Sequence, residues 1–148
     1  MNVLLSKTYL FFFSIIPLIL AFSYYNPENT FDVNIGDTYF VILNLHLGII
    51  LSVVYFILGL LYFILHKKGI RVNSWIIYTH SILTIGGLIL IWSLLKGMNN
   101  NPTKNFEELL KSIRINQYLT YICITTLFSM ILIQIVFVIS IFLKLIKK

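Results

Sequence analysis

The chain has 148 residues, of which 59% are hydrophobic and 11% are charged, and its mean hydropathy is +0.93. A soluble globular domain typically carries about 25% charged residues, so this composition excludes a water-soluble fold. The formal net charge of +6 comes from lysines and arginines at the ends of apolar blocks, a placement that excludes the basic helix or ribbon of a nucleic-acid-binding protein. We expect a lipid bilayer, and no nucleic acid, as the partner.

Four apolar blocks follow one another along the chain, at about residues 8–25, 38–65, 74–95 and 118–146. Each reaches the roughly 20 residues that cross the hydrocarbon, where only helices and closed barrels satisfy their own backbone groups. The blocks are continuously apolar rather than alternating, which excludes a barrel. The sequence therefore predicts an all-α integral membrane four-helix bundle, with residues 1–148 forming a single transmembrane domain.

The first block has a second interpretation. Pro17 lies in its middle, where proline would kink a helix. Lys7, the apolar stretch after it and the small pair Ala21 and Ser23 also resemble a signal peptide with a cleavage site. Cleavage would leave three helices without changing the orientation of the others, so this alternative stays open.

Basic residues are distributed unequally between the two sides that four helices define. With the N-terminus in the cytoplasm, seven of the eleven basic residues lie inside and all five acidic residues lie outside. The positive-inside rule, which counts basic residues near helix ends, favours this orientation. We therefore expect both termini in the cytoplasm of a bacterium and the protein in its inner membrane. The inner basic residues are Lys7, Lys67, Lys68, Arg71, Lys144, Lys147 and Lys148.

The outer loop before the fourth block contains a helical pattern of its own. Four apolar residues recur at the spacing of one helical face, and they are Phe106, Leu109, Leu110 and Ile113. Asn105 followed by Glu108 resembles a capping box. We predict a short amphipathic helix at about residues 105–114 that lies on the outer membrane surface.

Polar residues inside the blocks are the default candidates for function, and they are Asn44, His46, His80 and Gln134. The block interiors carry no Asp, Glu, Lys or Arg, which argues against a carboxylate proton relay and against the paired acids of a hydrolase. We predict no catalytic residue and no metal site. The alternative interpretation assigns these polar side chains to packing, with cross-helix hydrogen bonds to backbone or hydroxyl groups that contribute about 0.6–2 kcal/mol each.

Depth separates the two intramembrane histidines. In the expected topology His46 lies in the outer half of the bilayer, whereas His80 lies about two turns from the cytoplasmic end of its helix. With a rise of about 1.5 Å per residue, their depths differ by more than about 10 Å. The pair is therefore unsuited to ligate one haem that stands upright between two helices.

Residues 31–63 resemble part of the catalytic subunit I of haem-copper oxidases, the cytochrome c oxidase subunit I family. Asp32 matches the first acid of a stretch in that family, and residues 37–41 read DTYFV as the family does. His46 falls on a histidine that ligates the low-spin haem in the family. The four predicted helices would correspond to the last third of the family's core.

The resemblance implies one cofactor site and several departures from it. His46 would be an axial haem ligand, with Asp32, Asp37 and Asn44 close to it near the outer face. However, Asn44 stands where the family has the histidine of the high-spin haem, and an amide is a poor substitute for imidazole on haem iron. Gly36 replaces a histidine that helps to hold magnesium. The copper ligands belong to family helices that have no counterpart here, so we do not expect an enzyme.

Three functional hypotheses follow. The first is a non-catalytic, structural or accessory protein of the respiratory membrane that contacts oxidase subunits. The second is a haem-binding subunit in which His46 supplies one ligand and a partner chain, or a second copy in a homo-oligomer, supplies the other. The third, a small carrier, rests only on glycines that close helix packing also explains, at Gly48, Gly59, Gly86 and Gly87.

Overall fold

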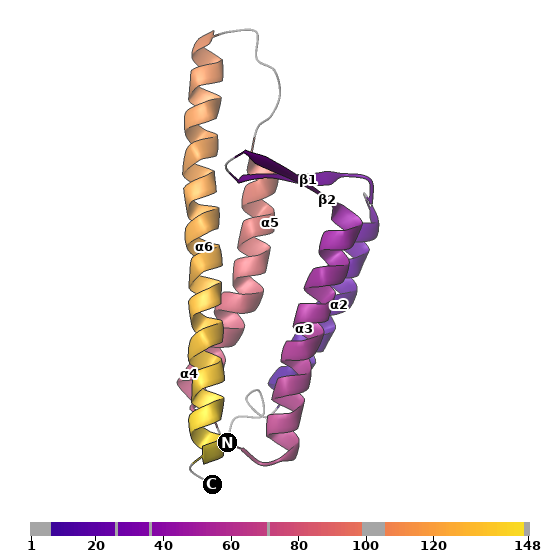
Figure 1. The fold of residues 1–148 in the computed structure, drawn as a ribbon, viewed down its shortest axis with the longest axis vertical. Coiled ribbons are helices and arrows are strands. Elements are labelled where there is room, and N and C mark those ends of the chain that lie inside the picture. The colour runs from indigo at the N-terminus through magenta and orange to yellow at the C-terminus, as the bar shows by residue number, and fades with distance from the viewer. Residues whose placement is uncertain (1–6, 26, 36, 71, 99–105, 147–148) are drawn as a thin grey trace. The chain divides into compact units, whose positions relative to one another are not determined.

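A computed structural model describes residues 7–25, 27–35, 37–70, 72–98 and 106–146. Within these ranges, four helices are long and apolar enough to cross a membrane, which confirms the predicted all-α class and the integral membrane setting. The chain divides into two compact units, Met1–Arg71 and Val72–Lys148, and each contains two of the four helices (Figure 1).

The first unit is a helix pair with a short hairpin between its members. Its elements are α2 (Thr8–Tyr25), β1 (Thr30–Ile35), β2 (Thr38–Leu43) and α3 (Asn44–Lys67). Helix α2 has the predicted bounds and continues through Pro17. Phe12 on α2 is fully buried and stacks on Tyr62 of α3 with ring centroids 5.2 Å apart. Aromatic rings therefore fill much of the contact between the two helices.

Two glycines of α3 allow α2 to approach closely. A Cβ atom on Gly48 would collide with the side chain of Ser23, whose hydroxyl donates to the carbonyl of Ile19 at 2.9 Å. A Cβ atom on Gly59 would lie 2.6 Å from the ring of Phe13. Small residues at such contacts are the usual way in which helices pack in lipid. The packing interpretation of Gly48 and Gly59 is confirmed.

A two-stranded antiparallel hairpin replaces the predicted start of the second helix. Ile35 pairs with Thr38, and Gly-Asp, a dipeptide typical of two-residue hairpin turns, separates them in the sequence. The amide of Asn44 donates to the carbonyl of Asn29 at 2.7 Å and closes the open end. The predicted helix start at residue 38 is wrong, because the aromatic and β-branched run at residues 38–43 finds a strand partner.

Helix α3 ends in a Schellman motif. Gly69 adopts a positive φ of 64°, the left-handed conformation that glycine takes without strain. Its amide donates to the carbonyl of His66 at 3.1 Å, and the amide of Ile70 donates to the carbonyl of Leu65 at 3.0 Å. These bonds satisfy carbonyl groups that the helix end would otherwise leave open.

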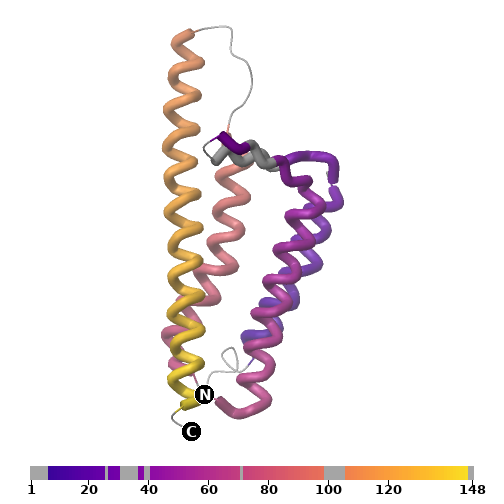
Figure 2. Tube along the Cα trace, in the orientation of Figure 1, coloured from indigo at the N-terminus to yellow at the C-terminus, as the bar shows by residue number. Residues whose placement is uncertain are grey.

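The second unit pairs an interrupted helix with a very long one (Figure 2). Its elements are α4 (Ser74–Ser81), the π-helical turn η1 (Ile82–Gly86), α5 (Gly87–Gly97) and α6 (Phe106–Ile146). The side chain of Asn73 caps α4 by accepting from the amide of Trp75 at 3.2 Å. A Cβ atom on Gly87 would lie 2.7 Å from the sulfur of Met130, so α5 and α6 also meet at a glycine.

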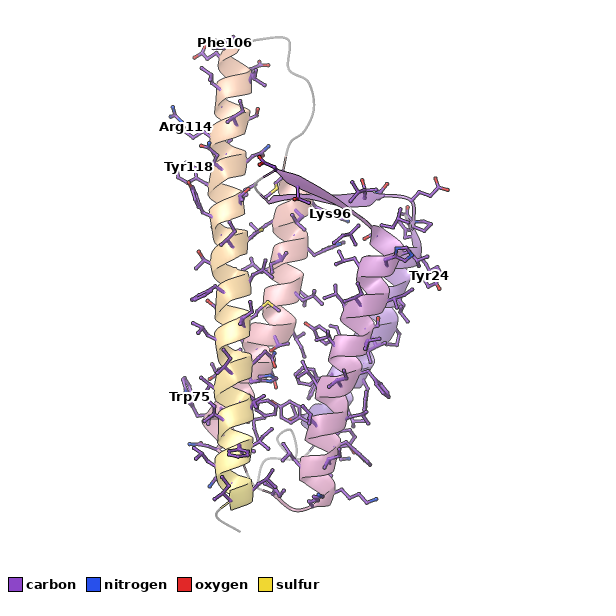
Figure 3. The ribbon with its side chains drawn as sticks, viewed as in Figure 1. Tyr24, Trp75, Lys96, Phe106, Arg114 and Tyr118 are labelled. Carbon is purple, nitrogen blue, oxygen red and sulfur yellow. The ribbon has the colours of Figure 1, made fainter. Side chains whose placement is uncertain are left out.

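Helix α6 is continuous over 41 residues, about 61 Å at 1.5 Å per residue. The expected separate surface helix at residues 105–114 is therefore wrong for its described part, because those residues form the first turns of α6. Figure 3 shows Phe106, Arg114 and Tyr118 along this N-terminal part of the helix. Residues 115–117, which include the polar Asn116 and Gln117, contain no Gly or Pro, so nothing in the sequence stops the helix between the two segments. The predicted cap Asn105 lies outside the described residues.

Candidate functional site

A buried polar cluster joins the two helices of the second unit. His80 of α4 is 0% exposed and Thr84 of η1 is 2% exposed. The Nε2 atom of His80 lies 2.8 Å from the amide oxygen of Gln134 on α6. The amide nitrogen of Gln134 donates to the hydroxyl of Thr84 at 3.0 Å. The predicted cross-helix bond to a hydroxyl group is confirmed for Gln134, whereas the Nε2 atom of His80 bonds across the helices to the side-chain amide of Gln134 rather than to a backbone or hydroxyl group.

An aromatic ring closes the cluster on the side of α6. Phe137 is fully buried and stacks on the imidazole of His80, with centroids 4.2 Å apart and an interplanar angle of 28°. It follows Gln134 by three residues, so both side chains lie on the same face of α6. Gln134 and Phe137 therefore hold His80 from two directions.

The π-helical turn places the third polar residue. Thr84 follows His80 by four residues and lies within η1, where one wider turn interrupts the regular helix. Such turns are rare in proteins, and many of those that do occur lie at functional sites. Gly87, the first residue after this turn, brings the backbone close to α6. Thr84 therefore lies within hydrogen-bonding distance of Gln134.

Hydrogen-bond chemistry assigns the roles within the cluster. The amide oxygen of Gln134 can only accept, so the Nε2 atom of His80 carries the hydrogen and donates. In this tautomer the lone pair of the neutral imidazole is on Nδ1, so Nε2 is used for the helix contact and is not a metal ligand. All three polar side chains can stay neutral, which avoids the high cost of a charge in hydrocarbon. The arrangement is suited to joining helices rather than to transferring protons to a substrate.

Two of the four members of this cluster are recognisable in the sequence. His80 and Gln134 stood out as polar residues within apolar blocks, whereas Thr84 and Phe137 are ordinary residues of membrane helices. The signal for Thr84 was its position four residues after His80, which becomes informative only once the partner on α6 is known.

The residues of the predicted haem site lie in the other unit. Asp37 is exposed beside the hairpin turn, Asn44 is the first residue of α3, and His46 is exposed in the first turn of the same helix. The backbone of Asp32 pairs with Val41 in the hairpin, and its side chain lies outside the described part of the structure. These residues belong to one continuous segment, from β1 to the start of α3.

Metal-ligating side chains and glycines are the remaining candidates for a site. Among the described residues, no group of three or more His, Cys, Asp and Glu side chains could hold a metal ion. A Cβ atom on Gly86 would meet no atom within 4 Å, so the packing interpretation fails for this glycine. Gly48, Gly59 and Gly87 each lie against a side chain of the neighbouring helix, as the packing interpretation predicts.

Comparison of the chain with protein-family models, with curated proteins and with solved structures finds no match in any of the three. The relationship to haem-copper oxidase subunit I therefore stays a hypothesis from the residues of the DTYFV segment.

Proposed function

We propose that the protein is a non-catalytic, structural or accessory integral membrane protein with both termini in the cytoplasm. The observation that carries this proposal is the buried cluster of His80, Thr84 and Gln134, whose polar atoms serve to join two helices. Buried polar groups inside a membrane are the default candidates for a catalytic or transport site. In this protein they form hydrogen bonds that support helix packing.

The DTYFV segment supports a setting for this role. Its likeness to haem-copper oxidase subunit I favours the respiratory membrane of a bacterium, with oxidase subunits as partners. The exposed Asp37 next to the hairpin turn is available for such a contact. On this proposal the protein stabilises or assembles an oxidase complex and does not itself reduce oxygen.

Co-purification tests the accessory role. Protein with a C-terminal affinity tag, extracted in digitonin and separated on a native gel, should migrate with oxidase subunits. Asp37→Ala should weaken this association, whereas Glu107→Ala in the other unit should leave it unchanged. Recovery of the tagged protein free of every oxidase subunit would sink the proposal.

Labelling tests the orientation. In a Cys123→Ser background, a maleimide that cannot cross membranes should label Arg114→Cys in intact cells and should not label Lys68→Cys. Both substituted positions lie outside the apolar core of the spans. The opposite labelling pattern would invert the topology and contradict the comparison with oxidases.

A haem-binding function is the second candidate, and the exposure of His46 favours it. An exposed imidazole in the first turn of α3 can meet a ligand from a second copy or a partner chain at equal depth. Purified protein should then show a Soret band, which His46→Ala should abolish. His66→Ala, at the opposite end of α3, is the matched control and should keep the band. Absence of visible absorbance from the unsubstituted protein would reject this candidate.

A further inference from the structure

An open groove of about 440 Å³ lies between the start of α4 and the last turns of α6, within the second unit. This volume falls in the range of about 300–1,000 Å³ that ligand sites occupy. The wall is mainly apolar and is formed by Ile76, Val136, Ile139 and Leu143. The groove therefore offers an apolar surface that the helix pair itself does not fill.

Polar groups mark one end of the groove. Asn73 lies directly before α4 and Lys144 lies in the last turn of α6, so both stand at the termini of their helices. Val136 lies eight residues earlier on α6, about 12 Å deeper along the helix axis. The groove is thus amphipathic, with a basic end and an apolar depth.

The charge of Lys144 is not balanced within the described second unit. The acidic residues described there are Glu107 and Glu108, at the opposite end of α6. Glu108 precedes Lys144 by 36 residues in the sequence, which corresponds to about 54 Å along the helix. Lys147 and Lys148 follow in the sequence and add positive charge at the same end of the chain. An anion is therefore the ligand that this end favours.

Aromatic residues place the basic end at the level of lipid headgroups. Trp75, two residues after Asn73, is 73% exposed, and tryptophan concentrates at the membrane–water interface. The ammonium nitrogen of Lys96 lies 3.9 Å from the ring centroid of Trp92. Lys96 stands near the other end of the same span (Figure 3). Trp75 and Lys96 are 21 residues apart, about 31 Å along a helix, which matches the hydrocarbon thickness of about 30 Å.

We propose that this groove binds one anionic phospholipid. Its phosphate contacts the ammonium of Lys144 and the amide of Asn73, and one acyl chain lies along Ile76, Val136 and Ile139. Charge selects the anionic lipid, because a zwitterionic lipid with the same chains offers the apolar contact without net negative charge. The proposed lipid site is the same on either face of the membrane. It therefore does not depend on the orientation of the protein or on its accessory role.

Native mass spectrometry of the full chain tests the proposal. Protein in detergent is offered equal amounts of phosphatidylglycerol and phosphatidylcholine with identical acyl chains. The unsubstituted protein should retain one phosphatidylglycerol, and Lys144→Ala should lower its occupancy about fivefold, the effect of one basic contact at a membrane surface. Lys111→Ala, at the other end of α6, is the matched control and should change nothing. Ile139→Trp should fill the groove and lower the retention of both lipids.

Four outcomes of the lipid experiment would overturn the proposal, and one change of oligomeric state would do so as well. These are equal retention of the two lipids by the unsubstituted protein, unchanged selectivity in Lys144→Ala, unchanged retention of both lipids in Ile139→Trp, and full competition by glycerol phosphate, which has no acyl chain. Conversion of a dimer to a monomer by Ile139→Trp would assign the groove to a second copy instead. Circular dichroism of each variant confirms that its helices are intact.

Discussion

The two helix pairs of this protein are joined by different physical means. Helices α2 and α3 meet through stacked rings, such as Phe12 on Tyr62, and through the contacts at Gly48 and Gly59. The interrupted span and α6 also meet at a glycine, but they add the hydrogen bonds of Gln134 to His80 and Thr84. The contacts just described for the first pair act through shape, and those described for the second pair combine shape with directional polar contacts.

This difference shows what each contact can specify when lipid is the solvent. Lipid tails are as apolar as leucine, so burial of apolar side chains supplies little drive for helices to associate. Close packing then determines how near two helices come, and hydrogen bonds determine their rotation and register. Substitutions in the first unit should therefore act through volume, and those in the second unit mainly through polar partners.

The largest effect should come from filling the closest glycine contact. In Gly48→Leu the new side chain must displace Ser23, which is hydrogen-bonded to Ile19, so we expect a loss of about 3 kcal/mol of stability. Unfolding by dodecyl sulfate in mixed micelles measures this change. Gly86→Leu, where no atom lies within 4 Å, should cost less than about 1 kcal/mol. Equal losses in the two variants would contradict shape-based pairing of α2 and α3.

The second effect should come from the bridging amide. Gln134→Leu keeps the approximate volume and removes a hydrogen-bond partner from both His80 and Thr84, with an expected cost of about 1–2 kcal/mol. The exposed Gln117→Leu on the same helix should stay within about 0.5 kcal/mol. A double-mutant cycle with His80→Phe should give a coupling energy of about 0.6–1.7 kcal/mol. Additive losses in that cycle would mean that the amide and imidazole do not interact.

A third substitution tests whether the stability of the second helix pair also depends on side-chain volume at its contact. Gly87→Ala places a methyl group against the flexible end of Met130, so a cost of about 1 kcal/mol is expected. In a Met130→Ala background the obstructing sulfur is gone, and Gly87→Ala should then be nearly neutral. The same micelle titration measures the cycle. An undiminished cost in that background would place the clash elsewhere.

The smallest effect should come from an uncompensated hydroxyl in the first pair. Ser52 of α3 is buried, and its hydroxyl finds no hydrogen-bond partner among the residues that the structure describes. Ser52→Ala should therefore leave stability unchanged or raise it by up to about 0.5 kcal/mol. A loss above about 1 kcal/mol in thermal unfolding would reveal a partner for this hydroxyl in the folded protein.

The spans were predictable because their signal is local. The first helix was predicted with the bounds that the structure gives it, and the third predicted block at residues 74–95 falls within Ser74–Gly97. Length and hydropathy suffice for this, because hydrocarbon leaves the backbone few alternatives. The hairpin was missed because the strand residues 38–43 are as apolar as the helix that follows them.

The errors at α6 and in the polar cluster have different causes. The polar pair Asn116 and Gln117 suggested a loop, but a change of polarity does not stop a helix when no residue breaks it. The cluster depends on a pairing between residues 50 and 54 positions apart, which a single sequence does not contain. His80 and Gln134 could be nominated by type, whereas Thr84 and Phe137 required the geometry.

The uninterrupted length of α6 has a mechanical consequence. Between Phe106 and Ile146 the helix contains neither glycine nor proline, so it lacks the usual hinge points. A partner that pulls or rotates the Glu107–Arg114 end would therefore turn the whole rod, including the Gln134 position and the Lys144 terminus. Helix α6 would transmit a force from one face of the membrane to the other as a rigid body, without any change in secondary structure.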